Sequence, residues 1–90
     1  MPNYQRNPDI EWKEFSGESL LLNLTTGAYF RLNAVGGLIW QMLDGATPTE
    51  TIVAAIQNRF TVSAEQARAD FDHFITVLSA QQLIRPATQP

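Results

Sequence analysis

The first third of the chain alternates apolar and polar residues over short stretches that turn residues separate. Residues 10–15, Ile-Glu-Trp-Lys-Glu-Phe, have the period of two that is typical of a strand with one buried face. After a turn at residues 16–18, the run 19–24 is strand-like in length, and residues 28–32 follow a second turn signal. The pattern therefore predicts three short antiparallel strands.

The loop before the strand 28–32 sets which side chains face the core. Residues 25–27, Thr-Thr-Gly, fit a three-residue hairpin loop in which Gly27 adopts the left-handed conformation. The expected core-face pairs are Leu24 with Ala28, Leu22 with Phe30, and Leu20 with Leu32, while Leu21, Asn23, Tyr29 and Arg31 face the other side. A two-residue turn would bring a charge onto the core face, so we expect the three-residue loop.

From Asn33 onward the apolar spacing becomes helical and predicts three helices. Asn33 is the expected N-cap of the first helix, Thr47 that of the second with Pro48 at its first position, and Ser63 that of the third. The helices should end near residues 44, 60 and 82. The side chains expected on their apolar stripes are Val35, Leu38, Ile39, Met42 and Leu43, then Ile52, Val53 and Ile56, then Ala67, Phe71, Phe74, Ile75 and Leu78.

The two ends and one glycine pair complete the picture. Residues 1–8 are interpreted as a loose arm, and residues 83–84 as a segment that folds back before a polar tail. Gly36 and Gly37 lower helix propensity, so we expect a close backbone contact there. The prediction is a single α+β domain over residues 1–90, with a core at about 10–84 and a winged helix-turn-helix-like order of three strands followed by three helices.

Composition supports an ordinary globular chain. Of its 90 residues 44% are hydrophobic and 17% charged, proportions that a packed core can use. There is no cysteine, so disulfides and thiolate metal sites are ruled out. The sequence has no apolar run long enough to span a bilayer and no secretory pattern at its start, so we expect a cytoplasmic location.

Catalytic chemistry has few candidate residues. His73 is the single histidine, and without cysteine the usual metal ligands and nucleophile-base pairs cannot be assembled. The carboxylate pairs Asp70/Asp72 and Glu11/Glu14 are interpreted as parts of solvated faces. We therefore expect a protein that is not an enzyme and uses neither a metal nor another cofactor.

The winged-helix order raises DNA binding as an alternative function. The formal net charge is −3, from six Lys and Arg against nine Asp and Glu, and the basic residues are scattered. The third helix carries Arg68 beside Glu65, Asp70 and Asp72, so a DNA backbone would be repelled. We expect binding neither to nucleic acid nor to membranes.

The strand 28–32 offers a more specific hypothesis. It pairs with the strand 19–24 on one side, and its other edge carries neither the proline nor the lysine that usually protects a free edge. Such an edge accepts a partner strand.

Several short motifs along the chain resemble the PqqD-like family. They are Gly27-Ala28-Tyr29-Phe30-Arg31-Leu32-Asn33, Val35-Gly36, Ile39-Trp40, Leu43-Asp44-Gly45 and Thr49-Glu50-Thr51-Ile52-Val53. The resemblance covers about residues 10–84 and implies a recognition element for ribosomally synthesised, post-translationally modified peptides. In that family the leader of a precursor pairs antiparallel with the third strand and places side chains in the groove between this strand and the third helix.

By this resemblance the binding residues lie on the third strand and on one flank of the third helix. They are Ala28, Tyr29, Phe30, Arg31, Leu32, Arg68, Phe71, Asp72, Ile75 and Leu78. The domain would present the bound leader to a leader peptidase or another maturation enzyme.

Local motifs separate two branches of the family. The pyrroloquinoline-quinone proteins typically have a Tyr-Pro-Glu-Gly-like turn and a Cys-Asp-Gly ending of the first helix, where this chain has Thr25-Thr26-Gly27 and Leu43-Asp44-Gly45. The chain thus looks more like the stand-alone proteins of lasso-peptide clusters, which implies delivery to a leader peptidase and a macrolactam-forming cyclase. The alternatives are a peptide chaperone for a radical enzyme, a winged-helix DNA-binding regulator and a purely structural subunit.

Overall fold

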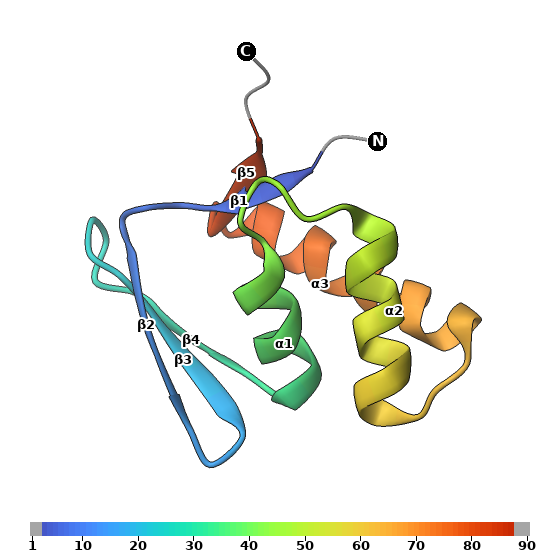
Figure 1. Cartoon of the computed structure of the whole chain (residues 1–90). Coiled ribbons are helices and arrows are strands. Elements are labelled where there is room, and N and C mark those ends of the chain that lie inside the picture. The colour runs from blue at the N-terminus through green and yellow to red at the C-terminus, as the bar shows by residue number, and fades with distance from the viewer. Residues whose placement is uncertain (1–2, 88–90) are drawn as a thin grey trace.

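The computed structural model describes residues 3–87 and has the expected order of strands followed by helices. The strands are β1 (Tyr4–Arg6), β2 (Ile10–Phe15), β3 (Glu18–Asn23), β4 (Tyr29–Leu32) and β5 (Ile84–Pro86), and the helices are α1 (Ala34–Met42), α2 (Thr49–Phe60) and α3 (Ala64–Ala80). β2, β3 and β4 form an antiparallel sheet in that order. The helices all lie on one side of this sheet, with α1 next to it (Figure 1). The α+β prediction is confirmed.

The loose arm predicted for residues 1–8 is wrong over its described part. Tyr4–Arg6 forms β1, which pairs antiparallel with β5 at the other end of the chain. Arg6 also donates from its guanidinium to the carbonyl oxygens of Trp40 and Gln41, at 2.9 and 2.8 Å. A cation is favourable at the carbonyl end of a helix, so the arm is tied to α1 as well as to β5.

The predicted register of β3 against β4 is wrong by one residue. The observed pairs are Ser19 with Leu32, Leu20 with Arg31, Leu21 with Phe30, and Leu22 with Tyr29. The faces of Phe30, Leu32, Tyr29 and Arg31 are as predicted, but Leu21 faces the core where Leu20 and Leu22 were expected to do so.

The cause of the shift is a hairpin loop of four residues, 24–27, in place of three. The side-chain oxygen of Asn23 accepts the backbone N–H groups of Thr25 and Thr26, at 2.9 and 3.3 Å, and the Asn23 carbonyl accepts the N–H of Gly27. Such an Asx turn adds a residue to the loop, and Gly27 has the left-handed φ of +80° that was predicted. Because the side-chain period of a strand is two, one extra loop residue exchanges the two faces of β3.

Two of the three predicted helix caps are confirmed. Asn33 accepts the N–H of Gly36 at 2.9 Å at the start of α1, and Ser63 accepts that of Gln66 at 3.1 Å at the start of α3. The cap predicted for α2 is wrong, because Pro48 occupies the N-cap position and no side chain caps that helix.

Thr47 instead belongs to a turn built around Asp44. Its hydroxyl donates to the Asp44 carboxylate, which also accepts the N–H groups of Ala46 and Thr47. These hydrogen bonds, with that from Ala46 the largest contribution, lower the pKa of Asp44 from its ordinary value.

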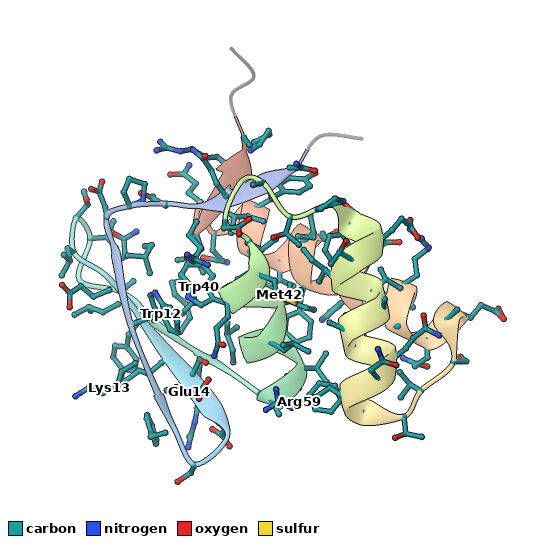
Figure 2. The ribbon with its side chains drawn as sticks, in the orientation of Figure 1. Trp12, Lys13, Glu14, Trp40, Met42 and Arg59 are labelled. Carbon is teal, nitrogen blue, oxygen red and sulfur yellow. The ribbon has the colours of Figure 1, made fainter. Side chains whose placement is uncertain are left out.

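The core lies between the sheet and the helices. Its buried apolar side chains are Ile10, Leu21, Leu32, Ile39, Trp40, Leu43, Ile52, Val53, Ile56, Ala67, Phe71, Leu78, Leu83 and Ile84. Trp40 is fully buried and meets Trp12 of β2 edge to face, with ring centroids 6.3 Å apart (Figure 2). The stripe expected on α2 is entirely buried, whereas Phe74 and Ile75 of α3 remain half-buried.

The glycine pair in α1 brings two neighbours close, as predicted. A Cβ atom on Gly36 would lie 2.6 Å from the ring of Phe74, and one on Gly37 would lie 2.8 Å from the hydroxyl of Ser19. Side chains at these positions would push α3 and β3 away from α1. Gly36 lies in the first turn of α1, directly after β4, and its missing side chain therefore allows α3 to pack closely against this turn.

Candidate functional site

The free edge of β4 is the first component of the candidate site. β4 is the last strand of the three-stranded sheet and has β3 as its single neighbour among the described strands. Asn23 donates its N–H to the carbonyl of Ala28 at 2.8 Å, so this pair is a hydrogen-bonded one. Because hydrogen-bonded and non-hydrogen-bonded pairs alternate in an antiparallel ladder, the backbone groups of Phe30 and Leu32 point to β3.

The backbone groups of Tyr29 and Arg31 therefore point away from the sheet. A second hydrogen bond supports the same alternation, because Leu24 donates to the carbonyl of Asp9 at 3.1 Å and so turns the even-numbered residues of β3 toward β2. Tyr29 and Arg31 thus present two N–H and two C=O groups along the open side of β4. This is the array that an added strand requires.

One flank of α3 is the second component. The ring of Phe74 lies against Gly36, in the first turn of the helix that follows β4. Asp70 and Val77 lie one turn before and after Phe74 on the same flank, since residues three and four apart share a helix face. Phe74 is half-buried and Val77 is 40% exposed, so the flank offers apolar surface near the first turn of α1, which directly follows β4. We call Asp70, Phe74 and Val77 the inner flank.

The residues predicted on α3 do not lie together. Phe71 and Leu78 are 3% and 0% exposed and belong to the core, and Ile75 is half-buried. Arg68 forms an ion pair with Glu50 at the start of α2, and this hydrogen bond and the nearby charge raise the pKa of Arg68.

Arg68 therefore marks the flank of α3 that faces α2. Asp72 follows it one turn later on an exposed part of the helix. A shallow hollow of about 520 Å³ lies over this second flank, and all of its lining residues come from α3, none from β4. Of the predicted strand residues, Tyr29–Leu32 form β4, with Phe30 and Leu32 turned toward the core, while Ala28 lies before the strand and its carbonyl accepts the N–H of Asn23.

The comparisons with known proteins agree with this fold. The family described as coenzyme PQQ synthesis protein D (PqqD) matches residues 18–84. The chain belongs to the PqqD family. No curated protein sequence matches it with significance.

Two solved structures share the PqqD fold of the chain over nearly their whole length. The structure described as TbiB1 in complex with the TbiA(beta) leader peptide has a TM-score of 0.82 and 29% identity, and the match covers 94% of this chain and 99% of that one. The structure described as lasso peptide synthetase B1 complexed with the leader peptide has a TM-score of 0.81 and 21% identity, with 93% and 99% covered. At the latter identity the likeness concerns the fold alone.

Asp70 and Val77 are not among the site residues predicted from the sequence, and Phe74 was expected in the core. One feature of the sequence indicates a second apolar surface on this helix, because Val77 is an apolar residue three positions after Phe74 and lies outside the predicted core stripe. The missing information was which flank of α3 faces β4. The contact between Phe74 and Gly36 carries that information, and it joins residues far apart in the sequence.

Other chemistry in the described part of the chain is sparse. His73 is exposed, and its ring meets that of Phe74 edge to face at 5.5 Å. Residues 3–87 contain no group of three or more His, Cys, Asp or Glu side chains placed to hold a metal ion. None of the helices in this range is long and apolar enough to cross a membrane.

Proposed function

We propose that this chain binds the leader segment of a ribosomally made precursor peptide by adding the leader as a strand to β4. The observation that carries the proposal is the open row of Tyr29 and Arg31 backbone groups on β4, a strand that leads directly into the turn of α1 contacted by the inner flank of α3. Two proteins of the same fold are described as complexes with leader peptides, which supports this use of the fold.

The edge and the inner flank would contribute differently to binding. Four backbone hydrogen bonds, two to Tyr29 and two to Arg31, add about 1 kcal/mol each and tolerate many sequences. Leader side chains that cover Phe74 and Val77 add about 1.5–3 kcal/mol for each one fully buried, and these contacts select the sequence. After the cost of ordering a flexible peptide, a dissociation constant in the range of about nanomolar to micromolar is expected.

We further propose that the chain acts as a binding partner and leaves catalysis to another protein. The described residues bring no nucleophile-base pair or metal-ligand group to the β4 edge, and backbone pairing requires neither. The domain would hold the leader in the cytoplasm, where the precursor is made, and present the remainder of the precursor to a leader peptidase or another maturation enzyme. Lasso-peptide biosynthesis is the pathway that the described complexes favour.

The direct test is titration of folded protein with labelled leaders of lasso-peptide precursors, the TbiA(beta) leader among them. We expect at least one leader to bind in the micromolar range or more tightly, and amide exchange of Tyr29 and Arg31 to slow in the complex. A scrambled leader of the same composition is the control. Binding by no leader, or by leader and scrambled peptide alike, would overturn the proposal.

A further inference from the structure

The face of the sheet that points away from the helices carries an exposed apolar cluster. Alternation along the strands places Phe15, Leu20, Leu22 and Tyr29 on this side, and we call Leu20, Leu22 and Tyr29, on β3 and β4, the outer patch; Phe15 lies beyond it on β2. Tyr29 is 72% exposed, Phe15 45% and Leu22 39%. Figure 1 shows that the three helices lie on the opposite side of the sheet, so none of them covers the outer patch.

The outer patch extends to the free edge of β4. Leu22 lies directly opposite Tyr29, and their pair is of the non-hydrogen-bonded kind, in which side chains approach most closely. Leu20 is two residues from Leu22 on the same strand and therefore on the same face. Tyr29 is thus the part of the outer patch nearest to any strand that pairs with β4.

A strand added to β4 would place side chains on both faces of the enlarged sheet. Leader residues opposite Tyr29 and Arg31 would point outward, and the residue opposite Phe30 would point toward the inner flank of α3. We propose that the outer patch recognises an apolar side chain of the leader, at an odd number of residues from the positions that contact Phe74 and Val77. This inference rests on the proposed function and adds a second, outward-facing element of specificity to it.

The preference at this outward position should be apolar because the charged residue that follows Tyr29 on the same face of β4 is already paired. Arg31 is the outward neighbour of Tyr29 on β4, and its guanidinium donates to the carboxylate of Glu18 at 2.6 Å. The pair is close to neutral as a whole, so it would attract a charged leader residue only weakly. Tyr29 and Leu22, in contrast, gain from being covered by a carbon-rich side chain.

The experiment is selection from a displayed library of randomised peptides, followed by sequencing of the bound fraction. Peptides selected on the wild-type protein should show apolar preferences at two sets of positions: an inward set that contacts Phe74 and Val77, and an outward set that contacts the outer patch. Positions of one set should be an odd number of residues away from positions of the other. Tyr29→Thr, which keeps a strand-forming residue, should erase the outward set alone. It should weaken a wild-type selected peptide by about two- to fivefold, the range of one cross-strand contact.

Three further variants make the result decisive. Leu22→Thr alters the outer patch from the neighbouring strand and should repeat the effect of Tyr29→Thr. Phe15→Thr changes a similarly exposed residue of the same face on β2, away from the free edge, and should leave both sets unchanged. Arg31→Pro removes an outward N–H and should abolish enrichment, which tests the proposed function separately.

The outcomes separate the two proposals. Enrichment that Arg31→Pro does not affect would overturn the proposed function. If the peptides selected by the wild type have apolar preferences only at positions separated by even numbers of residues, the inference about the outer patch alone would be overturned. The same holds if the selected motif is unchanged in both Tyr29→Thr and Leu22→Thr. Dimerisation of the wild type in sedimentation, lost in Tyr29→Thr while the peptide motif stays intact, would assign the outer patch to a second copy of the chain and also overturn it.

Discussion

The two outer edges of the three-stranded sheet differ in what lies beside them. At β4 the backbone groups of Tyr29 and Arg31 point away from the sheet, and the inner flank of α3 contacts Gly36 in the turn of α1 that directly follows this strand. Beside β2 lie two hollows of about 370 and 300 Å³ whose linings include charged and polar side chains, and Gln41 of α1 donates a hydrogen bond to Glu14 there. Figure 2 shows Glu14 on the side of α1 and Lys13, from the next position of β2, pointing away from it.

A cationic side chain lies at the other end of β2. The guanidinium of Arg6 lies 5.8 Å from the ring centroid of Trp12 and 6.0 Å from that of Trp40. Both strands have unpaired backbone groups, but a peptide at β2 would meet the charged side chains of Arg6 and Glu14, whereas a peptide at β4 would meet the apolar side chains of the inner flank. Availability of a strand edge therefore depends on the side chains beside it more than on the backbone groups themselves.

The largest expected effect concerns the anchoring of α3 beside β4. Phe71→Ala should lower the free energy of unfolding by about 3–5 kcal/mol, because Phe71 is buried in the core. Denaturant unfolding measures this loss, and Val77→Ala, on the exposed inner flank, should change stability by only about 0.5 kcal/mol. A stable Phe71→Ala protein with impaired leader binding would instead support the role in the groove that the sequence suggested for Phe71.

The next effect tests the two edges directly. Arg31→Pro removes an N–H that points away from the sheet, so leader affinity should fall by about tenfold or more while the ladder to β3 keeps its bonds. Glu14→Pro is the matched control, because the same alternation turns the Glu14 backbone away from β3 on the β2 edge. Isothermal titration of both folded variants gives the comparison, and a larger loss for Glu14→Pro would assign the leader to β2.

The third effect tests the apolar flank that only β4 possesses. Val77→Asp places a charge where a leader side chain should be buried, and we expect affinity to fall by about fivefold, which corresponds to about 1 kcal/mol. Thr76→Asp adds the same charge one residue away, on an exposed side of α3, and serves as the control. Equal effects of the two substitutions at several salt concentrations would indicate general repulsion and not a contact at Val77.

The smallest effect concerns the flank of α3 that faces α2. Arg68→Glu breaks the exposed ion pair with Glu50 and should lower stability by about 0.2–1 kcal/mol. Leader affinity should change by less than about twofold in both Arg68→Glu and Asp72→Lys, because a side chain on this flank does not reach the free edge of β4. A tenfold loss in either variant would move the groove to this flank.

Much of the local structure follows from the sequence alone. Asn33 and Ser63 cap their helices because their side-chain oxygens lie within reach of N–H groups three residues later, a relation that depends only on nearby residues. The helical stripes and the alternation of β2 and β4 also follow from short-range periodicity. The free edge at β4 was predicted for the same reason, since the strand order follows from two short hairpins.

The register of β3 and the placement of α3 depended on contacts that the sequence pattern does not contain. Leu20, Leu21 and Leu22 are all apolar, so alternation could not select a face, and the Asx turn at Asn23 together with the contact between Ser19 and Gly37 decided it. Which flank of α3 borders β4 was decided by the contact between Phe74 and Gly36. A helix rotates about its axis to fit its neighbours, so only the packed structure determines which residues beside an apolar stripe line a groove.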